Sequence, residues 1–329
     1  MLLFTGHTAL EYWRWVIRTV CVDKAIQEKY DPDSQSVPLS IDYIRRSMAP
    51  EVTPGLREAR FESDFFRNSL PIETMVAHDK YKNHQEGIRC FVRPQRFPAR
   101  SFCRINKTTY VVSPELLFLE SAIHMDFLQL LLLGYELTAK HVIDTTDIRG
   151  ICKSKPLITA EKLQTYLAHF DRYKGLDKAR KAADLVSGKS ASPMETRLAI
   201  LLTLPRRLGG FGLPKPVMNH RIAIDSDKSQ GFNKGNLEFD LFWKKGNLAV
   251  EYDSDLFHSS DSKIGDDSAK RNAALRHGYK VITVTKDEFA DINRMEDIAR
   301  NISRVIGFRL PAMGIKHRSE MIALKKRLM

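Results

Sequence analysis

The stretch LEFDLFWKKGNLAVEYDSDLFH, residues 237–258, constrains the fold more than any other part of this chain. Its apolar residues alternate along both halves: Leu237, Phe239, Leu241, Trp243, Leu248, Val250 and Tyr252. Because a β-strand sends alternate side chains to opposite faces, this pattern predicts two strands with one apolar face. Residues 244–247 (KKGN) separate the strands, and Gly246 can adopt the positive φ of a tight turn. The stretch is therefore predicted to be a β-hairpin.

Three carboxylates, Asp240, Glu251 and Asp253, fall on the other face of this hairpin. Clustered carboxylates repel one another and raise each other's pKa unless a cation lies between them. Oxygen ligands of this kind suit Mg²⁺ or Mn²⁺, which lowers the pKa of a bound water and neutralises charge on a phosphodiester. An acidic hairpin that faces solvent is the alternative. The metal interpretation requires that the carboxyl groups converge and are not paired with arginine or lysine.

Residues near the hairpin in the sequence add to the metal interpretation, and each also has a structural alternative. His258 is a candidate general base or acid, or a turn histidine. Arg271 and the adjacent Lys270 are candidate phosphate contacts, although Arg271 could instead pair with an aspartate one turn earlier. Glu195 is a candidate ligand, but Ser192-x-x-Glu195 also matches a capping box.

The order of elements around the hairpin predicts a mixed α/β domain. A helix over 192–204, a strand over 219–224, the hairpin, a helix over 266–277 and a strand over 280–285 follow one another. The small polar run GKSAS, residues 188–192, precedes them and is the best domain boundary. We therefore expect two domains, 1–190 and 191–329, in an α/β (α+β) chain whose C-terminal sheet is mixed and flanked by helices.

The region before the boundary is predicted to be mostly helical with a small β element. Helices are expected over about 9–20, 116–137, 159–170 and 176–186, and short strands between Gly87 and Pro114. The segment 87–114 carries basic residues among phenylalanines and no acid. This combination favours phosphate contact and base stacking through Arg93, Arg96 and Arg100, with a solvated sheet face as the alternative.

The charge balance is basic, with a formal net charge of +12 over 329 residues. A basic chain favours a polyanionic partner such as DNA, although good solubility explains the charge equally well.

The run 116–137 contains four ionisable residues, so we expect it to be a buried helix and not a membrane span. The four cysteines lack metal-type spacing, and with no apparent signal peptide we expect reduced thiols in a cytoplasmic protein.

The succession Glu195 on a helix, Asp240 on a strand and Glu251-Tyr252-Asp253 on the next strand resembles the PD-(D/E)xK nuclease superfamily. DLFWKKGNLAVEYDSDLFH followed by DDSAKRNAALRHGYKVITVT resembles its very-short-patch-repair endonuclease-like branch over roughly residues 191–290. The segment YVVSPELLFLESA in the preceding region resembles abortive-infection antitoxin-type regulators more loosely.

The resemblance implies a restriction-endonuclease-like fold and a role for each matching residue. Asp240 would be the central metal ligand, Glu251 would hold the same ion, Glu195 would be an outer ligand or position water, and His258 would act on water or the leaving oxygen. The chain departs from the superfamily at Asp253, where the superfamily has lysine. An aspartate cannot activate water electrostatically as lysine does, though it could become a further ligand, and Lys270 could supply the missing charge.

Three functions are compatible with these residues. The leading hypothesis is a Mg²⁺- or Mn²⁺-dependent endonuclease that hydrolyses DNA. The second is a nuclease fold without catalysis that binds DNA as a regulator or antitoxin-like component of a defence or toxin-antitoxin system. The third is a toxin or subunit that requires a protein partner.

Overall fold

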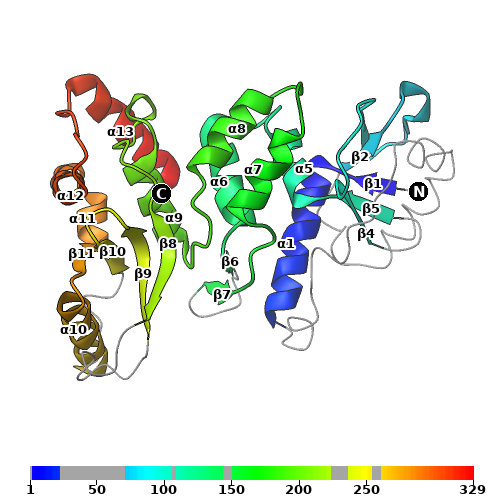
Figure 1. The fold of residues 1–329 in the computed structure, drawn as a ribbon. Coiled ribbons are helices and arrows are strands. Elements are labelled where there is room, and N and C mark those ends of the chain that lie inside the picture. The colour runs from blue at the N-terminus through cyan, green and yellow to red at the C-terminus, as the bar shows by residue number, and fades with distance from the viewer. Residues whose placement is uncertain (1, 23–70, 106–108, 144–149, 224–235, 254–260) are drawn as a thin grey trace. The chain divides into compact units, whose positions relative to one another are not determined.

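The computed structural model describes residues 2–22, 71–105, 109–143, 150–223, 236–253 and 261–329. The chain divides into two compact units, Met1–Val186 and Ser187–Met329. Both contain β-sheets and helices, so the mixed α/β class predicted from the sequence is confirmed (Figure 1). The division falls within the run of small and polar residues around position 190, close to the predicted boundary between 190 and 191.

The first unit contains a five-stranded sheet in the order β3-β2-β1-β5-β4. Its strands are β1 (Leu2–Phe4), β2 (Ile72–Val76), β3 (Ile88–Val92), β4 (Phe102–Arg104) and β5 (Thr109–Val112). The strands β3, β4 and β5 confirm the short strands predicted between Gly87 and Pro114. The sequence analysis did not identify β1 and β2, which pair with each other and with predicted strands. A separate hairpin joins β6 (His141–Ile143) and β7 (Ile151–Lys153).

Helices pack with this sheet and with one another, and they provide most of the core of the first unit. They are α1 (Gly6–Val22), α5 (Pro114–Ser121), α6 (Phe127–Leu137), α7 (Ala160–Ala168) and α8 (Leu176–Leu185). Trp13 of α1 is 1% exposed, and its Nε1 donates to the carbonyl of Val112 on β5 over 2.9 Å. This bond satisfies the buried indole N–H and fixes α1 against the sheet.

The single helix predicted over 116–137 is wrong, because the structure has two helices there. The first, α5, ends at Ser121, and α6 begins after Asp126. Asp126 and Gln129 form a capping box, in which the Asp126 side chain accepts from the Gln129 N–H over 3.0 Å. This cap satisfies backbone N–H donors at the start of a new helix. Its hydrogen bonds favour a second helix, although the apolar run continues through this point. Most side chains of the two helices are buried, as expected, whereas His124 and Asp126 between them are exposed.

The second unit is built on a four-stranded mixed sheet in the order β11-β10-β9-β8. Its strands are β8 (Val217–Ala223), β9 (Asn236–Trp243), β10 (Leu248–Asp253) and β11 (Lys280–Thr285). The strands β9 and β10 form the predicted antiparallel hairpin, and Gly246 in its turn has φ 87°. The remaining pairs are antiparallel for β8 and β9 and parallel for β10 and β11.

The helix between β10 and β11 covers part of this sheet. It is α10 (Asp261–Arg276), and its Ala273 and Ala274 pack with Leu237, Phe239 and other buried residues of the hairpin. A second helix, α9 (Pro193–Thr203), contacts β9 and β10. The helices α9 and α10 therefore hold Glu195 and Lys270 near the hairpin.

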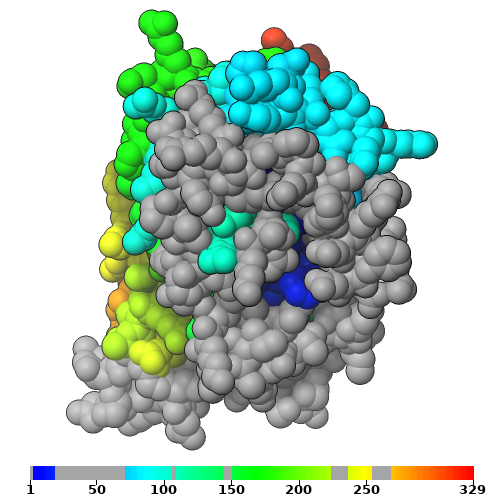
Figure 2. Space-filling view, turned by 90° about the vertical axis from the view of Figure 1, so that its right-hand side faces the viewer, coloured from blue at the N-terminus to red at the C-terminus, as the bar shows by residue number. Residues whose placement is uncertain are grey.

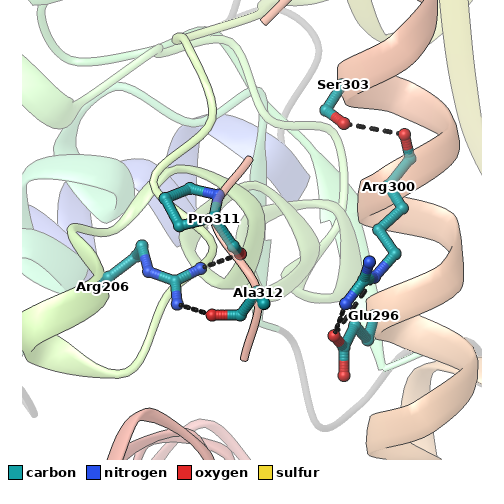
Figure 3. Close-up of polar contacts among 6 residues, drawn as sticks. All are labelled: Arg206, Glu296, Arg300, Ser303, Pro311 and Ala312. Atoms are coloured by element: carbon teal, nitrogen blue, oxygen red, sulfur yellow. Dashed lines mark hydrogen bonds and ion pairs between the residues drawn. The ribbon is translucent and has the colours of Figure 1, made fainter. Parts of the chain in front are cut away.

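The C-terminal part of the second unit consists of helices that follow β11. They are α11 (Lys286–Ala290), α12 (Ile292–Val305) and α13 (Ile315–Leu328), with the short 3-10 helix η3 (Arg206–Leu208) after α9. Arg206 donates to the carbonyls of Pro311 and Ala312 over 2.9 and 2.8 Å (Figure 3). These bonds tie the segment before α13 to η3.

The cysteines differ from the expectation of four reduced thiols. Cys90 and Cys103 are not disulfide-bonded, but Cys152 is. Sequence spacing did not reveal this bond because a disulfide requires two cysteines to be close in space, not in sequence. Within the described ranges, no helix is long and apolar enough to span a membrane.

Candidate functional site

The sheet of the second unit opens around Asp240. The β9–β10 ladder pairs Val250 with Leu241 and ends there. One residue further, the Asp240 side chain itself accepts the Tyr252 N–H through Oδ2 over 2.8 Å. This bond replaces a ladder bond with a carboxylate, so Asp240 lies between the two strands at the point where they separate.

The environment of Asp240 raises its pKa to about 7. Burial is the largest cause, and the negative charges of Glu195 and Glu251 add to it. The Tyr252 N–H and the Lys270 ammonium oppose the shift. A carboxylate is destabilised in this way when other acids share a poorly solvated space with it. Three of the predicted site residues, Glu195, Asp240 and Glu251, are therefore electrostatic neighbours.

Glu251 has a cationic partner from the helix. Lys270 on α10 forms an ion pair with it through Nζ and Oε1, with the two side chains 25% and 19% exposed. Lys270 Nζ also lies 5.5 Å from the centroid of the Phe239 ring. An ammonium over an aromatic face gains a further electrostatic attraction. Lys270 was predicted as a phosphate contact, and the structure instead gives it this carboxylate partner.

Glu195 is 7% exposed and sits in the first turn of α9. Ser192 caps the helix as predicted, since its side chain accepts from the Glu195 N–H. The Glu195 carboxylate does not complete the capping box, however: its Oε2 accepts from the Ala191 N–H over 2.8 Å and from Asn219 Nδ2 over 2.6 Å. The sequence analysis missed Asn219, because its contact spans 24 residues.

The three carboxylates share one feature. In each, one oxygen is held by the protein: Glu195 Oε2, Asp240 Oδ2 and Glu251 Oε1. Among the described residues, no hydrogen-bond donor occupies the second oxygen of any of them. Oriented carboxylates with an available oxygen are what a hard cation requires.

The donor set fits a divalent cation only in part. Within the described ranges, no three His, Cys, Asp or Glu side chains converge closely enough to hold a metal ion. The expected set Asp240, Glu251 and Asp253 therefore does not form a three-ligand centre here. Mg²⁺ needs only one or two carboxylates when waters and substrate oxygens complete its shell, so Asp240 and Glu251 fit such an ion. Among the residues that the structure describes, no arginine or lysine forms an ion pair with Asp240 or Glu195, whereas Lys270 pairs with Glu251.

The remaining predicted residues of the second unit lie at or beyond the edge of this group. Asp253 is the last residue of β10 and is partly exposed. Arg271 is exposed on α10, next to Lys270. His258 lies outside the described residues, so its predicted role stays a prediction.

The basic segment of the first unit is divided between structural and exposed residues. Arg93 forms an ion pair with Glu120, whose side chain is 5% exposed, through Nη2 and Oε2 at 2.8 Å. Arg96 and Arg100 are exposed. Phe97 and Phe102 pack edge to face with ring centroids 5.5 Å apart, and Phe102, which is 2% exposed, is too deeply buried to stack on a base. Figure 2 shows residues of this part of the chain, in cyan, at the surface of the first unit.

The first unit also contains a pocket of about 380 Å³ that the sequence analysis did not anticipate. Its charged lining includes two ion pairs, Glu73 with Arg89 and Glu120 with Arg93. The Glu73 carboxylate accepts the His7 N–H at the start of α1 over 2.6 Å. The charges that line this pocket are therefore largely neutralised by one another.

No model of a protein family, no curated protein and no solved structure matches this chain. The assignment of a function therefore depends on the geometry of the carboxylate group on its own.

Proposed function

We propose that this protein is a divalent-metal-dependent endonuclease acting on DNA, with its site at Asp240, Glu251, Glu195 and Lys270. The observation that carries the proposal is the buried position of Asp240 beside Glu195 of α9 and Glu251 of β10, where burial first and the two neighbouring acids second raise its pKa to about 7. Carboxylates are brought together against their mutual repulsion chiefly where they bind cations or transfer protons.

The roles follow from the contacts of each side chain. Asp240 and Glu251 would hold Mg²⁺ or Mn²⁺, which supplies charge neutralisation for the phosphodiester and lowers the pKa of a water nucleophile. The Tyr252 N–H orients Asp240, and Asn219 with Ala191 orients Glu195. Lys270 brings a positive charge to Glu251 from α10, which is the charge that the superfamily places two residues after its second acid.

The experiment is a cleavage assay of the full chain with Mn²⁺ or Mg²⁺ on supercoiled, nicked, mismatched and single-stranded DNA. We expect cleavage by the wild type and a loss of about 100-fold or more in Asp240→Asn, because a ligand to the catalytic cation is removed. Glu238→Gln is the matched control: it lies on the same strand and pairs with Arg221, outside the group. Wild-type protein that leaves all four substrates intact would contradict the proposal.

The second candidate is a DNA-binding protein with this fold and no catalysis. The Lys270–Glu251 ion pair favours it, since a resident ammonium already neutralises one proposed ligand. The two candidates differ in their response to Asp240→Asn. Salt-sensitive DNA binding that survives this substitution, in a protein that binds no Mn²⁺ in calorimetry, would select the second candidate.

A further inference from the structure

Asn219 has an unusual backbone for a strand residue. Its φ is 46°, and within the described part of the chain it is the one non-glycine residue with positive φ inside a β-strand. Asparagine tolerates this left-handed region better than most residues, but it still costs about 1 kcal/mol. Strained backbone of this kind concentrates at functional sites, where the surrounding contacts maintain it.

The position of Asn219 in the sheet is opposite Asp240. The β8–β9 ladder pairs Met218 with Leu241 and His220 with Phe239, which leaves Asn219 and Asp240 facing each other without a recorded pair. The ladder of β9 with β10 also ends before Asp240. The hydrogen-bonded pairing of the sheet is thus interrupted on both sides of Asp240. On the side of β8, the interruption lies at Asn219, the residue with positive φ.

The side chain of Asn219 connects this interruption to α9. Its Nδ2 donates to Glu195 Oε2 over 2.6 Å and to the Lys189 carbonyl over 2.9 Å, so both amide hydrogens are used. In a capping box, a glutamate at this position of a helix accepts a hydrogen bond from the backbone N–H of the cap residue, here Ser192. Glu195 instead shares its Oε2 between Asn219 and the Ala191 N–H.

We propose that Asn219 is a positioning residue for the cation site: its amide holds the buried Glu195 carboxylate beside Asp240, so that Glu195 adds its charge to the site formed by Asp240 and Glu251. This inference rests on the proposed function. The positive φ of Asn219 serves the same purpose, because it directs the side chain of a strand residue toward the first turn of α9. Asn219 itself is not assigned as a ligand.

The test separates the amide from the backbone conformation. Asn219→Gly removes the amide but favours positive φ, so the relief of backbone strain should partly offset the loss of one donor to the buried Glu195 carboxylate, and we expect the protein without metal to remain folded. If Asn219 positions Glu195, calorimetric titration should show Mn²⁺ affinity falling by about 10-fold in Asn219→Gly, as for losses of groups that orient ligands. Asn219→Ala, which removes the amide without adding a charge, is the second variant, and we expect a similar loss of Mn²⁺ affinity.

A double-mutant cycle identifies the route of the effect. If Asn219 acts through Glu195, Asn219→Gly should weaken Mn²⁺ binding in the wild-type background and have no further effect in Glu195→Gln. Losses that simply add, or Mn²⁺ binding by Asn219→Gly equal to wild type, would overturn the inference. If Asp240→Asn abolishes Mn²⁺ binding while Asn219→Gly does not alter it, only the role of Asn219 fails. If the wild type binds no Mn²⁺, or Asp240→Asn binds it normally, the proposed site fails and the inference with it.

Discussion

Lys270 of α10 is ion-paired with Glu251 of β10 and lies over the ring of Phe239. The two paired residues are 19 positions apart in the sequence and meet because α10 packs on the hairpin. The PD-(D/E)xK pattern places its lysine on the same strand as the second acid, where this chain has Asp253. The ammonium therefore reaches the acidic group from a helix.

Replacing Lys270 by methionine should have opposite effects on stability and on metal binding. Without metal, the partly buried Glu251 would lose its partner, and we expect the free energy of unfolding at neutral pH to fall by about 1–3 kcal/mol. Mn²⁺ should bind several-fold more tightly, because a competing cation is gone. Urea unfolding and calorimetry measure the two effects, with Lys270→Arg as the control that retains the charge. Weaker Mn²⁺ binding by Lys270→Met would show that the ammonium does not compete with the ion.

The stability of the protein should depend on pH through Asp240. Its pKa rises from 3.8 in the reference state to about 7 in the folded protein, so between these values the folded state retains a proton that the unfolded state has lost. Stability attributable to protonated Asp240 is therefore complete below about pH 4 and is lost as the pH rises toward 7.

The comparison of wild type with Asp240→Asn isolates this effect. We expect the stability difference in favour of the asparagine variant to grow from pH 4 to pH 7 and then to level off, reaching on the order of a few kcal/mol. Denaturant unfolding at a series of pH values measures it. A difference that is constant with pH would mean that the carboxyl group titrates normally.

Arg93 should be important for stability, whereas Arg96 should not. Arg93→Met would leave the buried Glu120 carboxylate without its cation, and we expect a loss of about 3–5 kcal/mol in the free energy of unfolding. Arg96→Met, on an exposed side chain of the same segment, should change stability by less than about 0.5 kcal/mol. The double variant Arg93→Met/Glu120→Leu should recover much of the loss, because neither charge is then buried alone. Equal stability of the two arginine variants in urea unfolding would refute this assignment.

The exposed arginines of the basic segment should contribute to DNA binding through phosphate contacts. If they do, Arg96→Met and Arg100→Met should each reduce the slope of log affinity against log salt concentration by about one. Fluorescence anisotropy with a labelled duplex measures this slope. Arg172→Met, an exposed arginine elsewhere in the first unit, is the control and should leave the slope unchanged. Unchanged slopes in all three variants would place the DNA-binding surface elsewhere.

Local sequence patterns determined the secondary structure and part of the site. The alternation of apolar residues in the hairpin, the turn at Gly246 and the cap at Ser192 are all present in the structure. Each of these features involves residues at most a few positions apart, so it can be read from the chain before any packing is known. The alternation also placed Asp240 and Glu251 on one face of the hairpin, whereas Glu195 was added separately and through the family resemblance; in the structure both glutamates contribute to the raised pKa of Asp240, after burial.

Only the tertiary structure decided which partner each charged side chain has. The pairing of Lys270 with Glu251, of Arg93 with Glu120 and the Asn219–Glu195 bond join residues 19 to 27 positions apart. The strands β1 and β2, separated in sequence by more than sixty residues, likewise form only when the sheet assembles. Such contacts depend on how helices pack on sheets. The free energy of an ion pair is set by the distance between the charges and by their burial, not by their separation in sequence. A local sequence pattern therefore cannot predict which charged side chains will pair.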